Sequence, residues 1–187
     1  MDKQDNFQFN FSLKGYSSIQ IGIYFLIAAF FIKSILNGFL IDDDPLAMMS
    51  AEIVEILIFV IIFFTLLLST LALFYKGRRK ARKLEYKLWN KKTKTNSWKY
   101  IASFSIIFLI ILFLNYQGYV NYVTPVFLIS YGVSLLLLKI KKSKNLFVLS
   151  GLCLFLAIIC FLIPNYWYSS VNILGLAHIT YGVVIRN

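Results

Sequence analysis

Residues 76–99 read KGRRKARKLEYKLWNKKTKTNSWK and hold eleven of the chain's nineteen Lys and Arg residues, with one acidic residue, Glu85. Strongly apolar stretches lie on both sides of this segment. Carrying so many positive charges through a bilayer is very costly, and Lys/Arg-rich loops accumulate on the cytoplasmic side of membranes. The segment therefore predicts a membrane protein in which residues 76–99 form a basic cytoplasmic loop. The position of this loop determines on which side of the membrane every other loop lies.

The composition is that of a polytopic membrane protein. Of the 187 residues, 59% are hydrophobic and 14% are charged, whereas soluble domains average about 45–50% apolar and about 25% charged residues. Apolar runs of about 18 residues, the length that crosses a hydrocarbon core of roughly 30 Å, recur along the chain. A net charge of +11 would point to nucleic acid in a soluble protein, but this charge lies in loops, where anionic lipid headgroups account for it.

The apolar runs predict an all-α integral membrane protein with six transmembrane helices. Their approximate bounds are 17–40, 51–75, 100–114, 123–138, 146–163 and 169–185. The loops on the side opposite the basic ones, 41–50, 115–122 and 164–168, contain no Lys or Arg. Both termini are therefore expected on the cytoplasmic side. The abundance of Lys, Asn, Ile, Phe and Tyr fits an A+T-rich bacterial genome, so the expected location is a bacterial inner membrane.

Residues 1–16 are expected to form an arm outside the six-helix bundle of residues 17–187. Residues 6–13 alternate strictly between polar and apolar types, which is the periodicity of a strand. Two interpretations remain open for this segment. It lays Phe7, Phe9 and Phe11 into the headgroup region, or it adds a strand to the sheet edge of a partner protein.

The second two-thirds of the chain contains a weak internal repeat. Tyr131-Gly132, in the fourth predicted span, falls 50 residues before Tyr181-Gly182 in the sixth. The repeat would make two helical hairpins in the same orientation. Because small residues let helix backbones approach closely, these four residues are predicted to serve helix packing.

Lys33 is the only basic residue within a predicted span. Counted from the acidic loop, it lies at about the same depth as Glu55, with Glu52 one turn higher. Intramembrane charges are costly and usually pair, so an ion pair between Lys33 and Glu55 is predicted. The pair is structural, with snorkelling of Lys33 to the interface as a variant, or it is a coupling or substrate-binding pair on a transport route.

His178 is the only histidine and lies in the sixth predicted span. It is a candidate proton or ligand site, against the alternative of a hydrogen-bonded helix-packing residue. Cys153 and Cys160 lie seven residues apart and lack the C-x-x-C spacing, so they are interpreted as small core side chains. No metal site, cofactor or catalytic residue is expected, because neither a nucleophile elbow nor a metal-ligand set is present.

Polar side chains on the two sides of the membrane have separate expected roles. On the cytoplasmic side, the basic residues of the long loop are predicted to bind lipid headgroups: Arg78, Arg79, Lys80, Arg82 and Lys83. On the opposite side, four asparagines are candidates to line a vestibule: Asn115, Asn121, Asn165 and Asn172.

The segment from Leu174 to Val184, with its Gly175, His178 and Tyr181-Gly182, follows an apolar run that begins at Gly151. Together they resemble uncharacterised small multi-span bacterial inner-membrane proteins built from helix hairpins. The resemblance covers about the last 50–60 residues. It implies a compact helical membrane bundle without an established activity, and therefore assigns no site residues.

These features favour a non-enzymatic membrane protein over an enzyme. The first hypothesis is a subunit or accessory component of a membrane assembly, formed with copies of itself or with a partner protein. The alternative is a small solute or ion transporter, or an oligomeric channel, that uses Lys33, Glu55 and His178. No nucleic-acid partner is expected.

Overall fold

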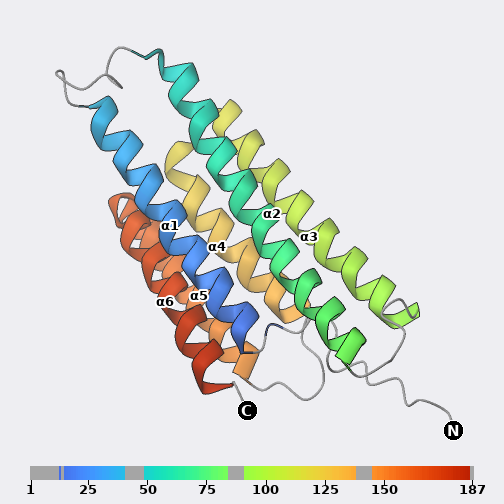
Figure 1. Ribbon diagram of the computed structural model, residues 1–187. Coiled ribbons are helices and arrows are strands. Elements are labelled where there is room, and N and C mark those ends of the chain that lie inside the picture. Colours follow the sequence, from blue (N-terminus) through green and yellow to red (C-terminus); the bar gives the residue numbers. More distant parts are fainter. Residues whose placement is uncertain (1–12, 14, 41–48, 84–90, 138–144, 186–187) are drawn as a thin grey trace, which may run out of the picture.

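The computed structural model describes residues 13, 15–40, 49–83, 91–137 and 145–185. These residues form six α-helices and one short 3₁₀ helix, and no strand (Figure 1). The elements are α1 (Tyr16–Phe39), α2 (Ala51–Lys83), α3 (Lys91–Tyr116), α4 (Val120–Leu137), α5 (Asn145–Leu162), η3 (Pro164–Tyr166) and α6 (Trp167–Val184). The predicted all-α fold is therefore confirmed for the described part of the chain.

Two helix ends show how local sequence sets the turns of the bundle. Ser50 precedes α2, and its backbone carbonyl and side chain accept hydrogen bonds from the first-turn amides of that helix, as expected of an N-cap serine. At the end of α3, Gly118 has φ +76°, its N–H donates to the Asn115 carbonyl at 2.8 Å, and Tyr119 N–H donates to the Leu114 carbonyl at 2.9 Å. This Schellman arrangement ends α3 and turns the chain directly into α4.

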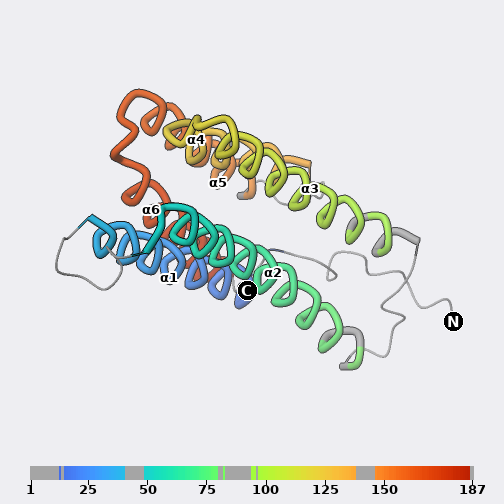
Figure 2. The backbone as a smooth tube through the Cα atoms, turned by 90° about the horizontal axis from the view of Figure 1, so that it is seen from above, coloured from blue at the N-terminus to red at the C-terminus, as the bar shows by residue number. Residues whose placement is uncertain are grey.

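The six helices form two layers of three (Figure 2). One layer contains α6, α1 and α2, and the other contains α5, α4 and α3. Each helix packs against the next one along the chain, and α6 returns to pack against α1, so the helices form a closed ring. The contact between α1 and α6 is the most extensive in the bundle, and the contact between α2 and α3 is the sparsest of the ring.

Successive helices run in opposite directions, as Figure 1 shows. At roughly 1.5 Å per residue, α4 with its 18 residues is about 27 Å long, and α2 with its 33 residues is about 50 Å long. The C-terminal end of α2 and the N-terminal end of α3 therefore extend past the other helices. We call the described part of this extension, residues 78–83 and 91–99, the basic extension.

Four helices are long and apolar enough to cross a membrane: α1, residues 51–79 of α2, residues 97–116 of α3, and α4. Only about a third or less of each of these segments is buried inside the protein. The outward surfaces carry exposed large apolar side chains such as Phe30, Phe63 and Leu109. Monomeric soluble proteins rarely expose apolar surface on this scale. The chain is accordingly a multi-pass helical membrane protein.

The remaining predictions about organisation have mixed outcomes. The six predicted spans each correspond to one helix, but α2 continues to Lys83 and α3 starts at Lys91, so both are longer than predicted. Residues 1–12, which include the alternating arm, lie outside the described residues; Leu13, which follows them, is buried. The hairpin repeat and the side on which the termini lie stay predictions.

Candidate functional site: a cavity between the two layers

A cavity of about 470 Å³ lies between the two layers, at the end of the bundle away from the basic extension. Asn115 and Val120, on either side of the Schellman turn after α3, and Pro164 of η3 are among its lining residues. Its walls come from the second half of α1, the first half of α2, the end of α3, the start of α4 and the start of α6. This volume falls within the range of roughly 300–1,000 Å³ that small-molecule sites occupy.

The cavity mouth carries its polar groups. Glu55 on α2 accepts a hydrogen bond from Asn115 Nδ2 on α3, with 3.0 Å between Nδ2 and Oε2. Asn121 and Asn165 line the same opening. Three of the four asparagines predicted for a vestibule are thus in the lining, whereas Asn172 is not among the lining residues.

The deeper walls are apolar and end on aromatic rings. Phe25 of α1 and Phe127 of α4 line the cavity, and their ring centroids lie 6.0 Å apart. Both rings also contact Tyr131, at 5.5 Å and 5.8 Å between centroids. Phe104 of α3 packs edge-on against the same tyrosine. This aromatic cluster, Phe25, Phe104, Phe127 and Tyr131, fills the space between the layers below the cavity and closes it on that side.

His178 lies fully buried beneath the cavity, against Phe25. The Ser18 hydroxyl donates to the backbone carbonyl of His178 at 2.8 Å, and the same oxygen lies 3.1 Å from Nδ1 of the ring. Because that hydroxyl has only one hydrogen, its oxygen accepts from Nδ1–H. In a neutral ring of this tautomer Nε2 is the acceptor, and the Tyr131 hydroxyl, 2.8 Å away, donates to it.

This arrangement agrees with a helix-packing role for His178, and its role as a proton or ligand site stays a prediction. Every hydrogen-bonding atom of its ring has a partner inside the protein, and the aromatic cluster separates it from the cavity. Of the two interpretations that the sequence left open, the structure favours the hydrogen-bonded packing residue. Ser18 and Phe25, which hold it, were not among the predicted site residues.

The predicted Tyr-Gly pairs lie at close helix contacts. A Cβ added at Gly132 would fall 3.1 Å from the Cβ of Cys153 on α5, and one added at Gly182 would fall 2.7 Å from the Gly15 carbonyl beside α1. The adjacent Tyr131 and Tyr181 are both buried. The predicted packing role of these residues agrees with their positions.

Two further glycines, Gly22 and Gly175, which were not among the predicted packing residues, bring α1 and α6 together. A Cβ added at Gly175 would fall 2.9 Å from Leu26 Cγ and 3.0 Å from the Gly22 carbonyl, and one added at Gly22 would collide with the Gly175 carbonyl. Gly15 and Gly22 are seven residues apart, as are Gly175 and Gly182. This matching spacing of two helical turns is the sequence feature that could have predicted the close contact between α1 and α6.

The predicted ion pair between Lys33 and Glu55 is not formed. Lys33 Nζ lies 4.1 Å from the centre of the Tyr168 ring on α6, and Glu55 bonds to Asn115. Equal depth in adjacent helices does not fix how each helix is rotated, and here the two side chains turn toward different neighbours. Glu52 is exposed and does not line the cavity.

The cysteines are core side chains, as predicted. Cys153 and Cys160 are fully buried and unbonded to each other, and the Cys160 thiol donates to Ser170 Oγ on α6 at 3.0 Å. Within the described ranges, no three His, Cys, Asp or Glu side chains gather in a metal-binding group.

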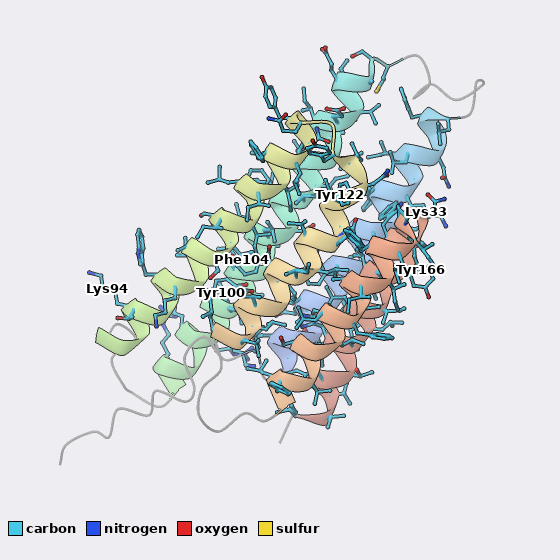
Figure 3. The ribbon with its side chains drawn as sticks, turned by 180° about the vertical axis from the view of Figure 1, so that it is seen from behind. Lys33, Lys94, Tyr100, Phe104, Tyr122 and Tyr166 are labelled. Atoms are coloured by element: carbon cyan, nitrogen blue, oxygen red, sulfur yellow. The ribbon has the colours of Figure 1, made fainter. Side chains whose placement is uncertain are left out.

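The residues predicted to bind lipid headgroups belong to the basic extension at the opposite end from the cavity. Arg78, Arg79 and Arg82 are exposed; the side chains of Lys80 and Lys83 lie outside the described part of the chain. Figure 3 labels Lys94 at this end and Lys33 on α1 in the opposite half of the bundle.

Comparisons of the chain with protein-family models, with curated proteins and with solved structures gave no match.

Proposed function

We propose that this chain is a non-enzymatic integral membrane protein that binds a small, largely apolar molecule from the side of the membrane opposite its basic extension. The cavity of about 470 Å³ carries this proposal. Its largely apolar walls suit an apolar body, its asparagines and Glu55 suit a polar head group, and the aromatic cluster lies at its inner end. A binding step of this kind is also the first step of a solute transporter.

The proposed topology has six spans. Helices α5 and α6 have 18 residues each, about 27 Å at the helical rise, and lie in the same bundle as the four long apolar helices. Of the described Lys and Arg residues, all but Lys33 lie on the last turns of α2 or the first turns of α3. The positive-inside rule then makes this end, and with it both chain termini, cytoplasmic in a bacterial inner membrane.

Binding is favoured over catalysis by the kinds of polar group that meet in the cavity. The lining contains one carboxylate, three asparagine amides and two threonine hydroxyls, those of Thr65 and Thr124. Hydrolases and transferases need a nucleophile beside a base, or a metal with an open position. The only described histidine is occupied by Ser18 and Tyr131 outside the cavity.

Native mass spectrometry of the protein, extracted gently from its own membrane, tests the proposal. We expect a retained small molecule in the original chain. Ala28→Phe should lose this mass, because Ala28 lines the cavity and a phenyl ring there would fill it. Ile27→Phe is the matched control, since Ile27 is exposed on the outer surface of the same helix. Two results would contradict the proposal. In the first, both variants retain the ligand equally; in the second, neither the original chain nor the control variant retains any small molecule.

A second candidate function is membership of a membrane assembly. The basic extension favours it, because this part of α2 and α3 projects past the bundle with Arg78, Arg79, Arg82 and Lys94 exposed. Trp98 is also 72% exposed there. Such a surface suits anionic headgroups or a partner protein. The same mass spectra report it: a discrete homo-oligomer or fixed hetero-complex supports assembly, and a monomer that keeps a small ligand supports binding alone.

A further inference from the structure

We infer that the ligand of the cavity is a protonated amine with an apolar body, a class of molecule set by Glu55. This inference rests on the function proposed above and adds the chemistry of the ligand. It depends on the charge of the lining, on the way in which the carboxylate is held, and on the distribution of apolar surface with depth.

The charge of the lining has one sign. Glu55 is the only ionisable side chain among the described residues that line the cavity, and no Lys, Arg or His joins it there. Lys33, which would have neutralised Glu55 in an ion pair, lies instead against Tyr168. A head group that enters this mouth therefore meets an unneutralised carboxylate, which attracts a cation and repels an anion.

The Glu55 carboxylate is oriented by a hydrogen bond to only one of its two oxygens. Asn115 donates to one of its oxygens, Oε2, at 3.0 Å, and Asn115 is itself fixed by the Schellman turn that begins at its carbonyl. The second oxygen can still accept a hydrogen bond. A primary ammonium group has three N–H donors and no acceptor, so it can bond to this oxygen and to the amide oxygens of Asn121 and Asn165 at the same mouth.

The depth of the cavity accounts for the apolar body. Below the mouth, most of the lining side chains are aliphatic or aromatic, down to Phe25 and Phe127, with the hydroxyls of Thr65 and Thr124 among them. A small hydrophilic cation would leave this surface wet or empty. An amine attached to a hydrocarbon or aryl group fills it and removes apolar area from water.

The proposal can be tested through Trp167, which lines the cavity. The chain has three tryptophans, so Trp89→Phe and Trp98→Phe leave Trp167 as the only indole. The protein in phosphatidylcholine nanodiscs is titrated with a medium-chain primary alkylamine that carries a terminal bromine, which quenches nearby indole fluorescence. The alcohol of the same length, also brominated, is the uncharged probe, and the same background with Ala28→Phe measures quenching from the lipid alone.

We expect the amine to bind at least about tenfold more tightly than the alcohol, the equivalent of one strong charge-assisted hydrogen bond. Glu55→Gln should abolish this preference, mainly by weakening the binding of the amine, because glutamine can still accept from Asn115 but carries no charge to attract an ammonium group. Glu52→Gln removes the same charge one turn away, outside the cavity, and should retain the preference.

The outcomes separate the two proposals. If amine and alcohol both quench Trp167 above the Ala28→Phe background, but with equal affinity whether residue 55 is Glu or Gln, the amine assignment is wrong and the cavity still binds apolar molecules. If neither probe quenches above that background, the proposed function itself fails. An equal loss of preference in Glu52→Gln and Glu55→Gln would show a general surface-charge effect and overturn the assignment to Glu55.

Discussion

The hydroxyl of Tyr131 on α4 lies 2.8 Å from Nε2 of His178 on α6, and this hydrogen bond joins the two layers of the bundle. The two helices are not neighbours in the ring, so the bond spans the interior and not a helix seam. Its location below the cavity makes it part of the structure that closes the cavity on that side.

Tyr131→Phe should destabilise the protein because Nε2 of the buried His178 would lose its donor. Interhelical hydrogen bonds in membrane proteins contribute up to about 1–2 kcal/mol, and an unsatisfied buried acceptor adds to the loss. The free energy of unfolding in mixed detergent micelles, followed by helical circular dichroism, measures the effect. Tyr181→Phe is the matched control, because the buried Tyr181 hydroxyl has no hydrogen-bond partner among the residues that the structure describes. Equal losses in the two variants would contradict the assigned role of the bond.

Gly175→Ala should loosen or displace the contact between α1 and α6. The added Cβ would fall 2.9 Å from Leu26 Cγ, closer than packed carbon atoms approach. Overpacking of this kind costs typically about 1–3 kcal/mol, measured as a lower free energy of unfolding. Gly151→Ala is the control, since no atom of the described residues lies within 4 Å of a Cβ added at Gly151 on α5. That change should be neutral, or stabilising by the intrinsic helix preference for alanine; a loss as large as that of Gly175→Ala would refute the packing argument.

The sequence determined the helices better than it determined their rotations. The hydrocarbon thickness imposes length and apolarity on a membrane span, so each apolar run located one helix, although α2 and α3 extend beyond the runs that predicted them. The partners of Lys33, Glu55 and His178 depend on the direction that each side chain takes around its helix axis. Their equal depth in neighbouring helices suggested that Lys33 and Glu55 would meet. Instead, Lys33 contacts Tyr168 and Glu55 bonds to Asn115.

The aromatic cluster was unpredictable for a related reason. Phe25, Phe104 and Tyr131 come from three helices, and apolar residues surround membrane helices on all sides, so no periodic face distinguishes the interior positions. Small residues gave a better guide: the predicted Gly132 and Gly182 lie at close contacts, and the missed Gly22 and Gly175 repeat the same feature.

Lys33→Met should have a small effect on stability. The ammonium lies 4.1 Å from the Tyr168 ring centre on an exposed surface, and exposed cation–π contacts contribute about 0.5–1 kcal/mol. A double-mutant cycle of Lys33→Met with Tyr168→Leu should therefore show a coupling of this size in the free energy of unfolding. The parallel cycle of Lys33→Met with Glu55→Gln should show additivity within about 0.3–0.5 kcal/mol. Strong coupling in the second cycle would restore the ion pair and remove Glu55 from its assigned place at the cavity mouth.

Replacement of Arg78, Arg79 and Arg82 by glutamine should reduce the binding of anionic lipid. These side chains are exposed on the part of α2 that extends beyond the bundle, and each basic residue near an anionic surface contributes about 1 kcal/mol. Native mass spectrometry from bilayers that contain phosphatidylglycerol counts the lipids retained by each variant. The triple replacement by lysine keeps the charge and should retain the original count, whereas the glutamine triple should retain fewer. A glutamine triple with an unchanged lipid count would mean that the exposed arginines face something other than headgroups. The partner protein of the assembly hypothesis would then be the better account of why α2 extends past the other helices.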